Sequence, residues 1–197
     1  MKVGVLALQG DFAEHIHMLQ RMGVETCEVR LASHLTDLDG LIIPGGESTT
    51  IGKLATEYEL IEPMRDFGKR RAIWGTCAGA IFIAKEVHRD QPILHLMDIS
   101  IERNAFGRQV DSFETELDVV SLEHPTRPFR AIFIRAPVIE NVGEGIEVLA
   151  KLNNNETDST GQIVAARQER LLATTFHPEL TADDRFHRLF ISLVEGQ

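Results

Sequence analysis

Short apolar segments, each ending near a glycine or proline, alternate with amphipathic segments through the first half of this 197-residue chain. Residues 3–8 are almost continuously apolar, and residues 41–43 and 72–74 repeat the pattern before Pro44 and Gly75. Such runs are typical of parallel strands, because helices cover both faces of a parallel sheet. Between them the sequence predicts a strand over 24–31 and helices over 12–22, 49–58 and 78–87, with a further helix that ends at residue 69. Asp11 is the expected cap of the first helix.

Strand-like segments dominate the second half, with few helical patterns between them. They cover residues 98–104, 114–120, 131–135, 147–152, 163–168 and 171–176. Antiparallel strands added to the parallel sheet would explain this change, with a polar loop at 153–161 and an amphipathic helix over 184–195. The sequence therefore predicts one domain over residues 1–197, of the three-layer α/β/α, flavodoxin-like type with a mainly parallel central sheet.

The charge of the chain argues against nucleic acid and membrane partners. Thirty acidic and twenty basic residues give a formal net charge of −10, whereas phosphate backbones and anionic lipids need a cationic surface. No apolar run approaches the roughly 18 residues of a spanning helix. The two cysteines, Cys27 and Cys77, form no CxxC motif and no zinc-like spacing with histidine. We therefore expect a cytoplasmic protein without a disulfide framework, metal or cofactor.

The sharpest local motif is Gly75-Thr76-Cys77-Ala78-Gly79, which lies between a predicted strand and a predicted helix. A strand that turns at once into a helix holds its central residue in a strained conformation, and the flanking glycines leave room for the turn. The free N–H groups at the start of the helix favour a thiolate over a thiol. Alone, the motif leaves two interpretations open, a catalytic cysteine or a buried structural cysteine at a tight turn.

A second motif, Phe176-His177-Pro178-Glu179, follows the last apolar strand. Thiol chemistry needs a base that takes and returns a proton, and a carboxylate that fixes the imidazole tautomer. His177 and Glu179 are two residues apart, so an extended backbone projects both side chains from one face. Together with the cysteine turn, this order predicts a Cys77–His177–Glu179 catalytic triad.

A glycine-rich loop, Pro44-Gly45-Gly46-Glu47, also begins at the end of a predicted strand. Two glycines let the backbone approach a ligand and turn an N–H inward, so Gly46 and Ala78 are the expected donors of an oxyanion hole. A phosphate-binding loop is excluded, because the glycine and lysine spacing that it requires is missing. Ser48 lacks the second glycine of a nucleophile motif, and we expect it to cap the following helix.

These three motifs together resemble the class I, triad-type glutamine amidotransferases. More narrowly, the chain is similar to the glutaminase subunits of pyridoxal 5′-phosphate synthase. The matching segments span nearly the whole chain, in order: 4–10, 14–15, 44–50, 75–79, 102–109, 133–137 and 176–181. The polar loop at 153–161 is longer than the family pattern, but it lies in no motif.

The resemblance implies hydrolysis of L-glutamine to glutamate and ammonia, which passes to a separate pyridoxal 5′-phosphate synthase subunit. It implies that Cys77 is the nucleophile that forms a thioester, His177 the acid and base, and Glu179 its orienting carboxylate. It also implies residues around the bound glutamine, namely Gly45, Gly46, Glu47, Arg103, Ile134 and Arg135. Without the motif match, Arg103 and Arg135 would be interpreted as surface ion pairs.

Two alternatives remain open: a glutaminase subunit of another pathway, such as histidine or aminodeoxychorismate biosynthesis, and a catalytically idle docking or regulatory subunit. His15 and His17 face different sides of a predicted helix, so shared metal ligation is not expected. We expect this stretch to form a solvated face or a contact with the synthase. His187 shows no ligand spacing and receives no role.

Overall fold

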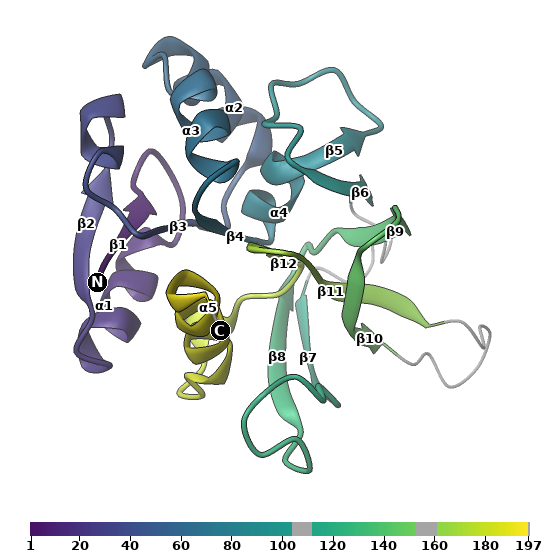
Figure 1. Ribbon diagram of the computed structural model, residues 1–197. Coiled ribbons are helices and arrows are strands. Elements are labelled where there is room, and N and C mark those ends of the chain that lie inside the picture. The colour runs from purple at the N-terminus through teal and green to yellow at the C-terminus, as the bar shows by residue number, and fades with distance from the viewer. Residues whose placement is uncertain (104–111, 153–160, 197) are drawn as a thin grey trace.

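A ten-stranded mixed sheet forms the centre of the computed structural model, which describes residues 1–103, 112–152 and 161–196 (Figure 1). One half of this sheet is parallel and has the strand order β2-β1-β3-β4-β12. Its strands are β1 (Lys2–Leu6), β2 (Glu25–Val29), β3 (Gly40–Ile43), β4 (Ala72–Thr76) and β12 (Leu171–Thr174). Every residue of β3, β4 and β12 is buried, as expected for strands that helices cover on both faces.

The other half of the sheet is mostly antiparallel and continues from β12 in the order β11-β9-β6-β5, with β10 also paired to β11. Only β5 and β6 run parallel to each other among these pairs. The strands are β5 (Ala84–Val87), β6 (Met97–Glu102), β9 (Val138–Val142), β10 (Glu147–Leu152) and β11 (Gln162–Gln168). The prediction of a mainly parallel sheet with antiparallel strands in the second half is confirmed.

Helices cover the two faces of the sheet and give the three predicted layers (Figure 1). On one face, α2 (Ser48–Glu57), α3 (Ile61–Gly68) and α4 (Ala78–Ile83) pack on β3 and β4. On the other face, α1 (Phe12–Arg21) and α5 (Arg185–Glu195) pack around Trp74. The apolar residues of α5 recur at helical spacing, and Gly196 ends the helix in the left-handed conformation at φ 78°. Two short 3-10 turns, η1 (Ala32–Leu35) and η2 (Pro178–Leu180), lie between other elements.

Two strand predictions of the second half need correction. β7 (Ser112–Leu117) and β8 (Phe129–Ile134) do not join the main sheet but pair with each other, and in Figure 1 they extend away from it. Phe113 and Phe133 stack at 4.7 Å between ring centroids, and Phe133 also lies 5.6 Å from the ring of Phe176. The pair therefore packs its apolar face on the core that it shares with α5 and the main sheet. β9 was not predicted at all. Residue 104 and most of the polar loop at 153–161 lie outside the described residues.

The helix predicted over 78–87 is too long, because α4 ends at Ile83 and β5 follows immediately. Two backbone N–H groups from the next loop take the place of further helical hydrogen bonds. Leu94 donates to the carbonyl of Phe82 at 2.7 Å, and Leu96 donates to that of Ile83 at 3.1 Å. The last carbonyls of the helix are therefore satisfied by distant residues, which local sequence patterns do not reveal.

None of the helices in the described ranges has the length and hydropathy that crossing a membrane requires.

The packing of α5 on Trp74 generates a stability prediction. Phe190 is fully buried and its ring centroid lies 5.7 Å from that of Trp74. We expect Phe190→Ala to lower the free energy of unfolding in urea by about 3–5 kcal/mol, because it leaves a cavity between helix and sheet. Tyr58, which is 48% exposed, provides the matched aromatic control, and Tyr58→Ala should cost less than about 1 kcal/mol. Equal losses for the two variants would contradict this packing.

Candidate active site

The carboxyl ends of four parallel strands meet at one edge of the sheet, where α/β proteins place their ligands. Residues that follow β1, β3, β4 and β12 there enclose a hollow of about 440 Å³. The residues that line it are Gln9, Asp11, Gly46, Glu47, Ser48, Cys77, Ala78, Ile81, Arg103, Ile134, Arg135, Pro137 and His177. The fold thus brings the three sequence motifs together around one hollow.

Cys77 sits at the bend between β4 and α4 in a strained backbone conformation. Its φ of 48° and ψ of −105° lie where a residue with a side chain is rare. The two neighbouring glycines are sterically required, because a Cβ on Gly75 would overlap the carbonyl of Gly79, and one on Gly79 would overlap the carbonyl of Ile43. The strained turn predicted at Cys77 is confirmed.

His177 lies beside Cys77, and the absence of a side chain at Gly45 makes this possible. A Cβ on Gly45 would overlap Cε1 of the His177 ring and would lie 3.4 Å from Cβ of Cys77. The ring donates from Nδ1 to Oε1 of Glu179 at 2.8 Å, which leaves Nε2 for the sulfur. The backbone N–H of His177 donates to the carbonyl of Ile132 at 2.8 Å and fixes the loop.

Burial disfavours the charged imidazole of His177, but the hydrogen bonds and negative charges of Cys77 and Glu179 outweigh it and raise its pKa to about 10. The ring is therefore an imidazolium at neutral pH, stabilised by the sulfur on one side and the carboxylate on the other. Burial raises the pKa of Glu179, although the His177 ring opposes that shift. The charged His177 ring thus favours the ionised form of this buried carboxylate.

A second carboxylate, Asp11, lies near the same ring, with Oδ2 at 3.5 Å from Nδ1 of His177. Asp11 makes no side-chain cap to α1, so its predicted capping role is wrong. The ligand atoms of Asp11, His177 and Glu179 lie within 4.8 Å of one another and could hold a metal ion. Since Nδ1 of His177 already donates to Glu179, the arrangement suits proton transfer rather than metal ligation.

The Gln9 side chain contacts the glycine loop after β3. Gly46 has a φ of 148°, and a Cβ there would overlap Oε1 of Gln9. The same Oε1 accepts from the backbone N–H of Glu47 at 2.7 Å, so Gln9 and Glu47 fix the loop beside the sulfur. Gln9 carried no predicted role. The signal that could have found it is its position directly after the first strand, at the edge where the other motifs end.

Glu47 and Arg103 form the polar wall of the hollow. Nη2 of Arg103 donates to Oε1 of Glu47 at 2.9 Å. Burial opposes ionisation of Glu47, but hydrogen bonds from Thr49, Thr50 and Arg103 lower its pKa to about 2. Glu47 also caps α2 by accepting from the backbone N–H of Thr50 at 2.9 Å. The predicted capping role of Ser48 is therefore wrong, because Ser48 is already the first residue of the helix.

Another part of the lining comes from the end of β8. Ile134 is 37% exposed, and its carbonyl oxygen lies 4.0 Å from the sulfur of Cys77. Arg135, with a φ of 43°, turns the chain away from the strand and lines the hollow. The structure thus brings every predicted site residue to this hollow or directly behind it. Of the motif at 102–109, only residues 102 and 103 lie within the described ranges.

The expectation for His15 is wrong. It is fully buried rather than solvated, and its Nδ1 lies 3.0 Å from Nε2 of His187, which is also fully buried. His15 faces into the molecule because it occupies the side of α1 that packs toward η2 and β4. The i, i+2 spacing with His17 excluded shared ligation, but it did not reveal that one of the two rings points inward.

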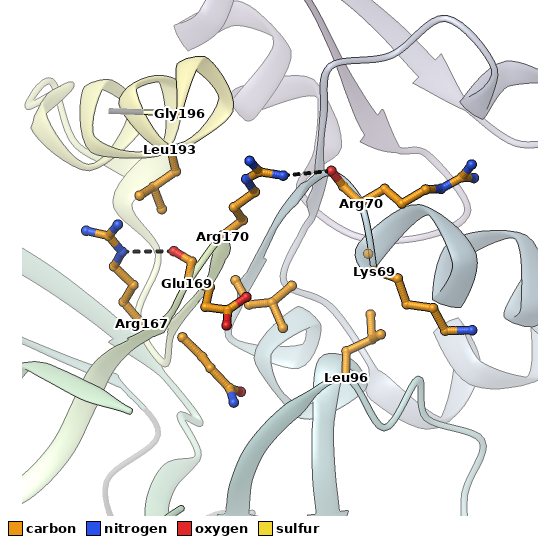
Figure 2. A pocket seen from close by; sticks show the side chains of 11 residues that line it. Lys69, Arg70, Leu96, Arg167, Glu169, Arg170, Leu193 and Gly196 are labelled. Atoms are coloured by element: carbon orange, nitrogen blue, oxygen red, sulfur yellow. Dashed lines mark hydrogen bonds between the residues drawn. The ribbon is translucent and has the colours of Figure 1, made fainter. Parts of the chain in front are cut away.

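A second hollow, of about 620 Å³, lies at the amino ends of β4 and β12, opposite Cys77 (Figure 2). Its basic lining residues are Lys69, Arg70, Arg167 and Arg170. Figure 2 shows Arg170 donating to the carbonyl of Arg70, at 3.0 Å, and Arg167 donating to that of Glu169, at 2.9 Å. It contains no predicted motif residue and no thiol, so the reactive groups concentrate at the other edge.

Comparison with known proteins finds relatives that match nearly the whole chain. A family profile described as the SNO glutamine amidotransferase family matches residues 5–196. Two relatives are named pyridoxal 5′-phosphate synthase subunit PdxT. The one from Herpetosiphon aurantiacus is 57% identical, and the match covers 98% of this chain and 100% of that relative. The one from Dehalococcoides mccartyi is 54% identical, and the match covers 99% of this chain and 98% of that relative. A crystal structure of a glutamine amidotransferase is 51% identical, with a TM-score of 0.89 and 98% of both chains covered.

The sulfur–imidazole contact generates a prediction for the pKa of His177. In Cys77→Ala the hydrogen bond and charge of the sulfur are lost, so the pKa of His177 should fall below about 10, and the ring should lose its proton at lower pH. A pH titration of the ring protons by NMR measures this. The control is exposed His88, whose pKa is raised by Glu140 and should stay unchanged. An unaltered titration of His177 would mean that the sulfur is not its partner.

Proposed function

Because this chain belongs to the SNO glutamine amidotransferase family, we propose that it hydrolyses L-glutamine to L-glutamate and ammonia, and that the ammonia passes to a separate pyridoxal 5′-phosphate synthase subunit. The observation that carries the proposal is Cys77, held at positive φ beside an imidazole that Glu179 orients. The name of the relatives, pyridoxal 5′-phosphate synthase subunit, supports the ammonia acceptor over the histidine and aminodeoxychorismate alternatives.

The Cys77–His177 pair starts the reaction as thiolate and imidazolium. The sulfur attacks the side-chain amide carbon and forms a tetrahedral intermediate, whose oxyanion accepts from the backbone N–H groups of Ala78 and Gly46. His177 gives its proton to the departing nitrogen, so ammonia leaves and a thioester remains. The neutral imidazole then takes a proton from water, whose oxygen attacks the thioester and releases glutamate. The sulfur and imidazolium return to their starting state.

The polar walls of the hollow suit the α-ammonium and α-carboxylate groups of glutamine, at the end away from its side-chain amide. Glu47 and Arg103 neutralise each other in the free site, and the α-ammonium and α-carboxylate of glutamine offer each a partner of opposite charge. The backbone of Gly45 and Gly46 and the end of β8 at Ile134 and Arg135 complete the enclosure. Substrates without an α-amino acid group would lose both ionic contacts.

Ammonia released into water at neutral pH is mostly protonated, and ammonium is not a nucleophile. Transfer inside a complex avoids this loss, which supports a synthase partner. We place the reaction in the cytoplasm, where thiols are kept reduced, and assign it to one domain formed by residues 1–197.

Replacement of the nucleophile separates catalysis from docking. In the complex with the synthase, Cys77→Ala should lower glutamine-dependent pyridoxal 5′-phosphate formation at least about a thousandfold, because no thioester can form. Formation from added ammonium salt should stay at the wild-type rate, which controls for assembly of the complex. Glutamine-dependent synthesis that persists in the variant would instead support the idle docking subunit. A glutamine-like electrophile should label Cys77 and not Cys27, as mass spectrometry can determine.

Removal of the arginine in the polar wall tests glutamine binding. We expect Arg103→Ala to raise the KM for glutamine about tenfold or more, because a charged hydrogen bond to the α-carboxylate is lost, while kcat changes much less. Steady-state ammonia release measures both constants. Arg130→Ala is the matched control, since Arg130 makes an exposed ion pair with Glu114 on the β7–β8 pair. A KM that stays at the wild-type value would remove Arg103 from the binding site.

A further inference from the structure

Two buried histidines that the proposed mechanism does not use lie directly behind the catalytic carboxylate. His15 on α1 and His187 on α5 are both fully buried. Nδ1 of His15 lies 3.0 Å from Nε2 of His187. On its other side, Nε2 of His15 lies 3.2 Å from Oγ1 of Thr76 and 3.4 Å from Oε2 of Glu179. The five groups Cys77, His177, Glu179, His15 and His187 therefore form one continuous polar chain into the core.

Both inner rings are neutral. Burial lowers the pKa of His15 well below its usual value, and the nearby His187 and His177 rings lower it further. Burial also lowers the pKa of His187 to about 3, with Asp184 opposing and Arg21 assisting that shift. The other side chains that pack here, Trp74 and Thr76 on β4, carry no charge. Each ring therefore has one N–H and one bare nitrogen.

The surroundings select the tautomers of the two rings. If His15 carried its proton on Nδ1, a bare nitrogen would face the negative Glu179, and the N–H at Nδ1 of His187 would be buried without a partner. An N–H on Nε2 of His15 and on Nε2 of His187 avoids both costs, because an unpaired buried donor is rarer than an unpaired acceptor. His187 then donates to His15, and the N–H of His15 points at Thr76 and Glu179.

The second oxygen of Glu179 needs such a donor. Within the described residues Oε2 has no aligned hydrogen bond, although it is buried, and an unpaired buried carboxylate oxygen is costly. The His15 ring lies between Thr76 and Glu179. Its Nε2 is within ion-pair distance of Oε2 of Glu179, but the two groups are not aligned for a hydrogen bond. A small shift of the ring or carboxylate gives Oε2 its donor.

We propose that His15 is a positioning residue for the triad, oriented by His187, and that its Nε2–H holds the Glu179 carboxylate ionised and turned toward His177. The effect of His15 on catalysis rests on the proposed function. Its effect on the state of the Cys77 sulfur does not, because that effect depends only on the contact between His15 and Glu179. Without the donor, Glu179 takes up a proton more readily. A neutral Glu179 stabilises the His177 imidazolium less, so the thiolate at Cys77 is lost at higher pH.

The decisive experiment compares His15→Gln with His15→Asn. A glutamine amide can place an N–H near the position of Nε2, whereas an asparagine amide reaches only the position of Nδ1. The two variants lose similar packing, so a purely structural role predicts the same result for both. The readout is the pH dependence of Cys77 alkylation by iodoacetamide, followed by mass spectrometry of the full-length protein, with Cys27 as the internal reference.

We expect His15→Asn to move the acid limb of the Cys77 profile upward by about one pH unit, which corresponds to about tenfold less thiolate below the limb. His15→Gln should retain a profile near that of the wild type. His187→Leu should shift the limb in the same direction as His15→Asn, because the His15 ring loses its orienting donor. His17→Asn, on the exposed side of the same helix, is the matched control and should leave the profile unchanged.

Glutamine hydrolysis in the presence of the synthase adds a second readout. His15→Asn should lower kcat about tenfold with KM within about twofold, since no group that touches the substrate is removed. Coincident alkylation profiles for His15→Asn and His15→Gln, or loss of thermal stability without any shift of the profile, would overturn the proposal. A wild-type protein that hydrolyses no glutamine would refute the proposed function instead, and the alkylation comparison would still decide the role of His15.

Discussion

The site depends on a bend at which three pieces of backbone approach each other too closely for side chains. Gly79 lies against the carbonyl of Ile43, and Gly75 lies against that of Gly79. This crowding forces Cys77 to a φ of 48° and directs its side chain to the hollow at the strand ends. The conformational cost of that bend, of order 1–3 kcal/mol, is offset by the buried parallel strands around it, β3, β4 and β12. Reactivity and packing therefore share the same few backbone atoms.

The parallel sheet explains how residues that are distant in sequence meet. β4 and β12 are neighbours in register, with Thr76 opposite Thr174, so the residues that follow each strand leave the sheet together. This pairing brings Cys77 and His177, 100 positions apart, to the same edge of the sheet. Gly45 is close by because β3 pairs with β4 on the other side. No long loop has to fold back over the sheet to bring these residues together.

Much of the site was predictable because its chemistry depends on short motifs at strand ends. The glycines around Cys77, the pair His177 and Glu179, and the glycine loop each carry a local steric or electrostatic reason that the sequence displays. The overall layers followed from apolar periodicity in the same way. The residues implied only by resemblance, Arg103 and Arg135 among them, could not have been chosen from spacing, since exposed arginines are common.

Features that depend on tertiary contacts escaped prediction. The end of α4 at Ile83 is set by N–H groups from Leu94 and Leu96. The β7–β8 pair leaves the sheet and packs its phenylalanines against Phe176 and Phe186. The burial of His15 depends on which side of α1 meets β4 and η2. In each case the deciding partner is far away in the sequence.

Trp74 is the one tryptophan of the chain, and its place in the core has a practical consequence. Its ring meets His187 edge-on at 4.9 Å and His15 at 5.6 Å between centroids. The emission of an indole responds to charge placed against its ring, so a proton that enters either imidazole changes the fluorescence of the protein. The fold thus contains its own optical reporter of the polar chain behind Glu179, without any added label.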